Sequence, residues 1–232
     1  MGHNFIRKIY RKKDIEKIQA KLNLLGENKK MTPEQYLNIR FFTTILVFIC
    51  MLYLFNLGYI VAPIVATIYY YGFYYLTLLH PIKERGKKLD REALHFFEIL
   101  TLTLESGRNL ENALEITICN VDSELSGEFK KALFETKFGK TLIEALEDMK
   151  NRIPSETINN IILNITQTDV FGNSILETMY NQIDFLRDKQ ILEIKGQINK
   201  IPNKISIISV LFIVPLILLL ILGPVLLQFL GE

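Results

Sequence analysis

The residues whose types and spacing come nearest to known chemistry are Gly139, Lys140 and Thr141, which resemble the end of a phosphate-binding loop. Such a loop requires Gly-x-x-x-x-Gly-Lys followed by Ser or Thr, directly after a strand, because its backbone N–H groups must surround the phosphates. Phe134 occupies the place of the first glycine, and no strand pattern precedes it. We therefore interpret the triplet as a junction between two helices and expect no nucleotide there.

Several carboxylates also lie near helix junctions, where a pair of acids could serve in acid–base catalysis. Capping of helix ends and attraction to the helix dipole explain acidic residues at such places more simply. We therefore expect none of these four to be catalytic: Glu105, Glu144, Asp169 and Glu177.

The histidines and cysteines give no metal-ligand pattern. His3, His80 and His95 lie far apart in the sequence, whereas metal ligands usually recur at short, defined spacings. Cys50 and Cys119 fall in different segments, and we expect both to be small buried side chains without a disulfide. The sequence thus predicts no catalytic, cofactor-binding or metal site, and a protein that is not an enzyme.

Long uncharged stretches indicate instead that the chain is an all-α membrane protein with three transmembrane helices. Residues 41–79 are 39 consecutive residues without a formal charge, which as a helix would measure about 58 Å, roughly twice the thickness of the hydrocarbon core. We therefore predict a hairpin of two spans, 41–57 and 58–79, with its turn near Asn56. Residues 205–230 form the predicted third span.

The distribution of Lys and Arg predicts how these spans are oriented. Residues 1–40 contain ten basic residues against four acids, and residues 80–91 contain five more basic residues. Basic segments remain on the cytoplasmic side, so we expect the N-terminus and residues 80–204 inside and the C-terminus outside. Residues 80–204 have 17 bases against 20 acids, which excludes a basic nucleic-acid-binding domain. The basic arm 1–40 fits an anionic lipid bilayer.

The arm is expected to be helical and to lead into the first span. Thr32 fits a helix cap, Pro33 the first helical position, and Gln35 the partner that completes a capping box. Before it, apolar residues at three- and four-residue spacing predict an amphipathic helix that lies on the membrane or on a partner. These residues are Ile15, Ile18, Leu22 and Leu25.

Residues 80–204 are predicted to form a cytoplasmic six-helix bundle of helix-turn-helix repeats. A glycine and a capping residue recur together three times, at spacings of 32 and 33 residues: Gly107 with Asn109, Gly139 with Thr141, and Gly172 with Ser174. Each glycine takes the left-handed conformation that ends one helix, and the residue two places later caps the next. The expected helices are 88–105, 110–120, 124–137, 142–152, 155–169 and 174–200. We expect the last helix, which runs toward Pro202, to couple this domain to the third span.

These junctions resemble those of the type II secretion system protein F (GspF) domain family. Residues 104–114 are similar to the family segment ALxAGxxLxxAL, and residues 167–175 to QxExxGxxLxxAL, with Asp169 in place of Glu. The order of basic arm, hairpin, helical domain and terminal span is similar to that of the single-domain platform proteins of tight-adherence (Tad) pili, TadB and TadC.

The resemblance implies a non-enzymatic inner-membrane platform subunit of a type IV or Tad pilus, or of a type II secretion-like machine. It implies three kinds of protein partner: a cytoplasmic secretion ATPase, pilin subunits, and a second platform subunit, which is a paralogue or another copy, since full-length family members have two such domains. The residues that shape the domain's turns would be Glu105, Gly107, Asn109, Gly139, Thr141, Asp169, Gly172 and Ser174. The alternative is a membrane adaptor or transport-complex subunit that binds another cytoplasmic partner.

Overall fold

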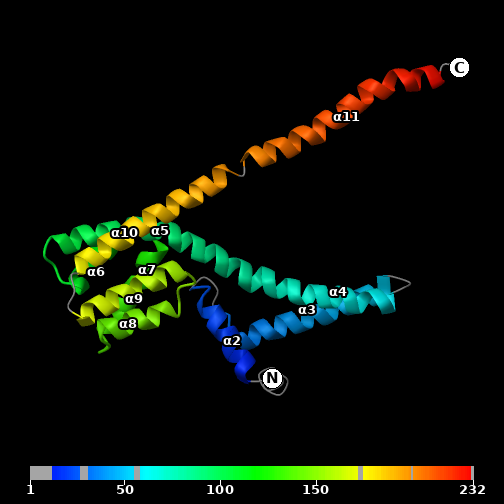
Figure 1. The fold of residues 1–232 in the computed structure, drawn as a ribbon. Coiled ribbons are helices and arrows are strands. Elements are labelled where there is room, and N and C mark those ends of the chain that lie inside the picture. The colour runs from blue at the N-terminus through cyan, green and yellow to red at the C-terminus, as the bar shows by residue number, and fades with distance from the viewer. Residues whose placement is uncertain (1–11, 27–30, 55–57, 172–174, 200, 231–232) are drawn as a thin grey trace. The chain divides into compact units, whose positions relative to one another are not determined.

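The computed structural model describes residues 12–26, 31–54, 58–171, 175–199 and 201–230, and all regular elements within these ranges are helices (Figure 1). The all-α prediction is therefore confirmed. Three helices in the described part of the chain are long and apolar enough to cross a membrane. The chain divides into two units, Met1–Ile183 and Asp184–Glu232.

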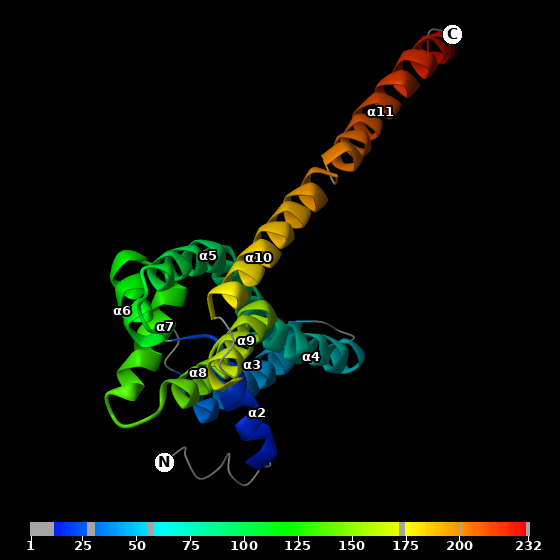
Figure 2. The same ribbon diagram turned by 60° about the vertical axis from the view of Figure 1, so that its left-hand side comes forward.

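Two of the apolar helices form a hairpin in the first unit. α3 (Pro33–Leu54) and α4 (Gly58–Tyr74) pack along each other and lie side by side in both views (Figures 1 and 2). α3 begins with the predicted capping box, in which the Gln35 and Thr32 backbone N–H groups each donate to the other residue's side chain at 3.2 Å. Many large apolar side chains of both helices point outward, as lipid-facing side chains do. The predicted turn at Asn56 lies outside the described residues.

The second span continues without a break into the helical domain. α4 passes through a π-helical turn, η1 (Tyr75–Leu79), into α5 (His80–Glu105), so that residues 58–105 form one uninterrupted helix. The sequence predicted that the first helix of the domain begins only at residue 88. Proline cannot donate the hydrogen bond of a regular helix, and the π-helical turn ends two residues before Pro81, at Leu79; the helix continues past the proline.

The remaining helices of the domain occur in the predicted order: α6 (Leu110–Asn120), α7 (Glu124–Thr136), α8 (Leu142–Lys150), α9 (Glu156–Phe171) and α10 (Ile175–Ile198). Consecutive helices from α5 to α9 pack on one another, and α5 also packs on α7 and α9. Three buried rings, Phe96, Phe97 and Phe129, fix the contact between α5 and α7, with Phe96 and Phe129 stacked at 4.5 Å. α5 therefore belongs to the core of the domain as well as to the membrane helix.

The predicted amphipathic helix of the basic arm is α2 (Lys12–Asn23). Its buried residues Ile18 and Leu22, followed by Leu25, form a core cluster with Tyr36 and Leu37 of α3 and Leu78 of η1. The apolar side of α2 thus packs against the membrane hairpin of the same chain. The sequence predicted that this side lies on the membrane or on a partner. In the structure it packs inside the protein, against α3 and η1.

The second unit contains the rest of α10 and the third apolar helix, α11 (Ile201–Leu230). The sequence predicted that the last helix of the domain spans 174–200, and α10 ends close to that bound, at Ile198; Asn199 lies in a turn and α11 begins at Ile201. Pro202 is the second residue of α11, a position where the missing N–H costs no hydrogen bond within the helix.

The expectation that both cysteines are buried was also wrong, since Cys50 and Cys119 are exposed. Cys50 lies on an outward face of α3. On α6 the buried residues Leu110, Ala113 and Thr117 share one face at helical spacing. Cys119 comes two residues after Thr117, and two residues turn a helix by roughly 200°, so its side chain points away from the core.

Candidate functional site at the Arg85 junction

The first two predicted repeat turns have the geometry that their glycines and caps require. Gly107 has φ +81° and Gly139 φ +94°, a left-handed conformation that glycine adopts without strain. The side chain of Asn109 accepts from the Asn112 N–H at 2.9 Å to begin α6. Thr141 begins α8 with a complete capping box, in which it accepts from the Glu144 N–H at 3.2 Å.

The third turn falls largely outside the described residues. Gly172 and Ser174 lie there, and nothing is described of the side chain of Asp169, although its backbone belongs to α9. Glu105, at the end of α5, accepts a hydrogen bond from the Tyr180 hydroxyl of α10. This bond raises the pKa of Tyr180 above its ordinary value. Glu105 therefore joins the first and third repeats, in addition to ending a helix.

The most connected polar side chain among the described residues was not singled out by the sequence: it is Arg85, on α5. Its side chain is only 7% exposed. Nε lies 2.6 Å from Glu124, and Nη2 lies 2.9 Å from Glu128, both on α7. Nη1 donates to two backbone carbonyls, that of Leu24 after α2 at 2.8 Å and that of Arg152 after α8 at 2.7 Å. One guanidinium thus joins four segments of the chain.

Glu128 is the buried anion of this junction, with a side chain 3% exposed. Besides Arg85, it accepts from Lys131 at 3.1 Å. The Nε of Arg152 lies 3.5 Å from its second oxygen, too long for a hydrogen bond, and that oxygen has no hydrogen-bond partner. Arg152 instead donates from Nη1 to Glu135 at 2.9 Å. The buried charge of Glu128 therefore depends chiefly on Arg85 and Lys131.

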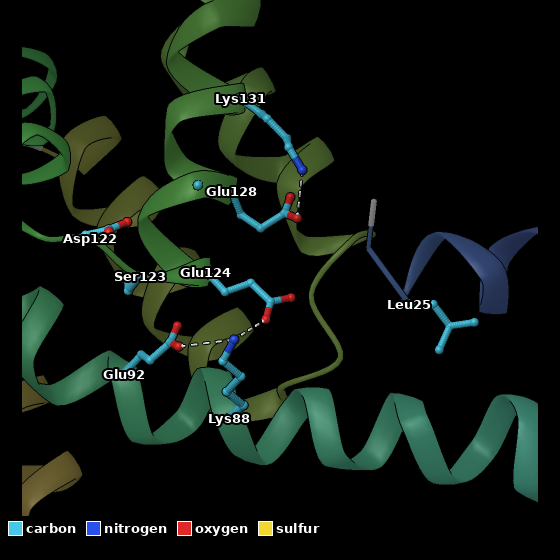
Figure 3. A pocket seen from close by; sticks show the side chains of 9 residues that line it. Leu25, Lys88, Glu92, Asp122, Ser123, Glu124, Glu128 and Lys131 are labelled. Atoms are coloured by element: carbon cyan, nitrogen blue, oxygen red, sulfur yellow. Dashed lines mark hydrogen bonds and ion pairs between the residues drawn. The ribbon is translucent and has the colours of Figure 1, made fainter. Parts of the chain in front are cut away.

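Beside the junction lies an open cavity of about 500 Å³, shown in Figure 3. Lys88 of α5 pairs with Glu124 of α7 at 3.0 Å and lies 3.8 Å from Glu92 on its own helix. Burial raises the pKa of Glu124, but the hydrogen bonds from Arg85 and Lys88 outweigh burial and hold that pKa below its ordinary value. Glu124 is therefore an anion that links α7 to two cations of the membrane-connected helix.

The polar groups of this cavity serve helix ends and ion pairs. Ser123 caps α7 by accepting from the Ser126 N–H at 3.0 Å, and Glu92 accepts from the Leu125 N–H at 3.0 Å. Acids and bases are paired across elements, an arrangement that holds helices in register. Within the described residues, no group of three or more His, Cys, Asp and Glu side chains gathers to hold a metal ion. The geometry is that of a mechanical junction.

A close backbone approach reinforces the junction at the next residue. A Cβ at Gly86 would lie 2.4 Å from the carbonyl oxygen of Pro154, a distance that no side chain tolerates. The loop between α8 and α9 therefore rests directly on the backbone of α5. Gly86 was the signal for this junction in the sequence, because a glycine inside a helix often has a packing reason such as a close backbone approach. The surrounding run of charges, residues 83–91, had indicated only a membrane boundary.

The Gly139-Lys140-Thr141 triplet forms the junction between α7 and α8. Lys140 lies 2.6 Å from Glu135 and 2.8 Å from Asp148. Hydrogen bonds to Asp148 and to Glu135 raise the pKa of Lys140, and the bond from Lys140 lowers the pKa of each carboxyl. The lysine thus pairs with carboxylates on both sides of the turn.

These features define a class: an all-α membrane protein whose helical repeat domain is built onto one of its membrane helices. Residues 96–223, more than half of the chain, match the family described as Type II secretion system (T2SS), protein F. The chain therefore belongs to this family of membrane proteins of secretion and pilus machines, as the motifs of its repeat junctions predicted. No curated protein and no solved structure matches the chain.

Proposed function

We propose that the protein is a non-enzymatic platform subunit in the inner membrane, on which a cytoplasmic secretion ATPase acts to drive pilin assembly. The machine is a type IV or Tad pilus or a type II secretion-like system. Support comes from the family match over residues 96–223 and from three helices long and apolar enough to span a membrane. The proposed orientation has the N-terminus and residues 80–204 in the cytoplasm and the C-terminus outside. The basic residues of 1–40 and 80–91 favour this orientation.

The observation that carries the proposal is the uninterrupted helix of residues 58–105 with Arg85 near its middle. A platform must transmit movement from a motor on one side of the membrane to a substrate within it. The helix connects the span to the domain without a loop, and the bonds of Arg85 to α7 and to two loops prevent the domain from turning about it. A push on the repeats would therefore move α4.

A second platform subunit, a paralogue or another copy of this chain, is part of the proposal. The end of α7 presents two neighbouring aromatic side chains to the surface, Phe134 and Phe138, which are 59% and 76% exposed. Their rings lie 4.8 Å apart in an edge-on arrangement. Exposed aromatic pairs of this kind favour protein contacts, and they support an assembly of more than one domain.

The test is affinity purification of the tagged protein from gently solubilised native membranes, followed by mass spectrometry of the proteins that accompany it. We expect a secretion ATPase and a second F-family protein, together with pilin. A tagged, unrelated inner-membrane protein of similar abundance is the control. Recovery of solute-transport components in place of the ATPase and pilin would contradict the proposal and favour the adaptor role.

A further inference from the structure

Arg40, on α3, is a buried cation for which the described residues supply no anion. It is the last charged residue before the uncharged stretch 41–79, and it is only 7% exposed. Its guanidinium carbon lies 3.5 Å from the ring centroid of Tyr70 and 5.1 Å from that of Tyr74, both on α4. Its Nε is buried and has no hydrogen-bond partner. The rings thus cover the face of the guanidinium and leave donors at its edge unused.

Aromatic faces compensate only part of the desolvation of a buried charge. An arginine whose flat face is stacked still presents a planar set of N–H donors, which matches a phosphate or carboxylate group. At the boundary of the hydrocarbon core, the anions present in quantity are the phosphates of lipid headgroups. The position of Arg40 in the sequence places it at this boundary.

A second cation lies on the same ring. Lys21 of α2 donates to the Tyr74 hydroxyl, and its Nζ lies 4.9 Å from the centroid of the Tyr74 ring. The Lys21 Nζ and the Arg40 guanidinium carbon therefore lie 4.9 Å and 5.1 Å from the same ring centroid. Two neighbouring cations repel each other, and an anion beside both of them would offset that repulsion. An ammonium also has two further donors after its bond to the tyrosine.

An apolar cavity is lined by residues that neighbour these cations and Tyr74 in the sequence or lie one helical turn from them. It has a volume of about 250 Å³ and lies between α2, the start of α3, and the segment around η1. Leu22 follows Lys21 directly, Phe73 precedes Tyr74, and Tyr36 lies one helical turn before Arg40. Free phosphate makes no use of an apolar cavity, whereas a phospholipid places its acyl chains beside its phosphate. The cavity is lined by Leu22, Leu25, Met31, Tyr36, Ile39, Phe73, Thr77 and Leu78.

The geometry points to a specific lipid site: Arg40 and Lys21 bind the phosphate of an anionic membrane phospholipid, with an acyl chain in the neighbouring cavity. The phosphate oxygens accept from the edge of the guanidinium and from the ammonium. The site stands independently of the platform function. A lipid bound there holds α2 against the membrane hairpin. Because the Leu24 carbonyl, just after α2, accepts from Arg85, the lipid also connects the Arg85 junction to the hairpin.

The experiment measures lipid binding to the purified full-length protein in a neutral detergent, by thermal unfolding and by native mass spectrometry. The probes are short-chain phosphatidylglycerol, short-chain phosphatidylcholine and inorganic phosphate. We expect phosphatidylglycerol to bind and to raise the midpoint of unfolding well above the effect of the other two. Equal effects of phosphatidylcholine would overturn the charge argument, and equal effects of inorganic phosphate would show an anion site without a lipid.

Substitutions locate the site. Lys21→Gln and Arg40→Gln are each expected to weaken phosphatidylglycerol binding by on the order of tenfold to a hundredfold, the range for hydrogen bonds to charged groups. Lys17→Gln removes the same charge from an exposed position of α2 and should change binding by less than about twofold. Equal losses in Lys17→Gln and Lys21→Gln would overturn the inference in favour of diffuse attraction. Should Arg40→Gln fail to fold, the half-buried Lys21 still decides the question.

Discussion

Replacing Arg85 with methionine tests the mechanical junction directly. The change removes the cation but keeps an unbranched side chain that fills part of the same space. Glu128 would then be a buried carboxylate without its main partner, and the Leu24 and Arg152 carbonyls would each lose a donor. Removing one partner of a buried ion pair typically costs about 3–5 kcal/mol.

The contacts that remain set the size of the expected loss. Lys131 still reaches Glu128 at 3.1 Å, but its own side chain is 35% exposed, and Arg152 stays 3.5 Å away. These residual contacts place the loss nearer 3 than 5 kcal/mol, within the range above. For a chain of this size each kcal/mol lowers the melting temperature by about 2–4 °C, so Arg85→Met should lower it by about 6–12 °C.

The assay is thermal unfolding followed by circular dichroism at 222 nm, with the protein in a neutral detergent. Lys87→Met is the matched control: Lys87 is also on α5, but it is 57% exposed and pairs with Glu84 on the surface. Such a pair contributes less than about 1 kcal/mol. The double variant Arg85→Met with Glu128→Met should regain part of the loss, because it leaves no unpaired buried carboxylate. Equal melting temperatures for Arg85→Met and Lys87→Met would refute the reasoning.

Three further predictions concern the same domain. Gly86→Ala should destabilise the protein by about 1–3 kcal/mol or more, because its Cβ clashes with the Pro154 carbonyl. At Gly127 a Cβ meets nothing within 4 Å, so Gly127→Ala should be neutral or stabilising by up to about 1 kcal/mol. Urea titration of the two variants measures the difference. The pKa of Glu124 is lowered in the folded state, so its ion pairs stabilise the fold fully above the ordinary pKa of 4.5. This stabilisation is lost as the pH falls through the lower folded-state pKa. Glu124→Gln should therefore reduce the fall in melting temperature at acid pH. Lys140→Ala should leave nucleotide binding by the purified protein unchanged from wild type, as measured by calorimetry, since Lys140 pairs with carboxylates of its own domain.

The sequence predicted the features that depend on local chemistry. Gly107 and Asn109 specify a turn and a cap within three residues, so their geometry can be inferred without knowing what surrounds them. The same holds for the capping box of Thr32 and Gln35. The hairpin was predictable because the thickness of a bilayer converts an uncharged length directly into a number of spans.

The features that the sequence did not reveal depend on contacts between distant segments. Arg85 is one of five basic residues in 80–91, and only the packing of α7 and two loops distinguishes it from its exposed neighbours. The passage of the helix through Pro81 depends on a π-turn, for which the sequence has no clear marker. The sequence accordingly placed the start of this helix at residue 88, whereas the helix runs unbroken from the second span into α5.

The most direct test of the platform role is surface filament assembly, or secretion, in a strain that lacks the gene and is complemented with wild type, Arg85→Met or Lys87→Met at equal protein levels. The account predicts that deletion abolishes assembly while pilin stays in the membrane, that wild type and Lys87→Met restore it, and that Arg85→Met does not. Normal assembly in the deletion strain would contradict the platform role, and full restoration by Arg85→Met would contradict the junction through which we propose that it works.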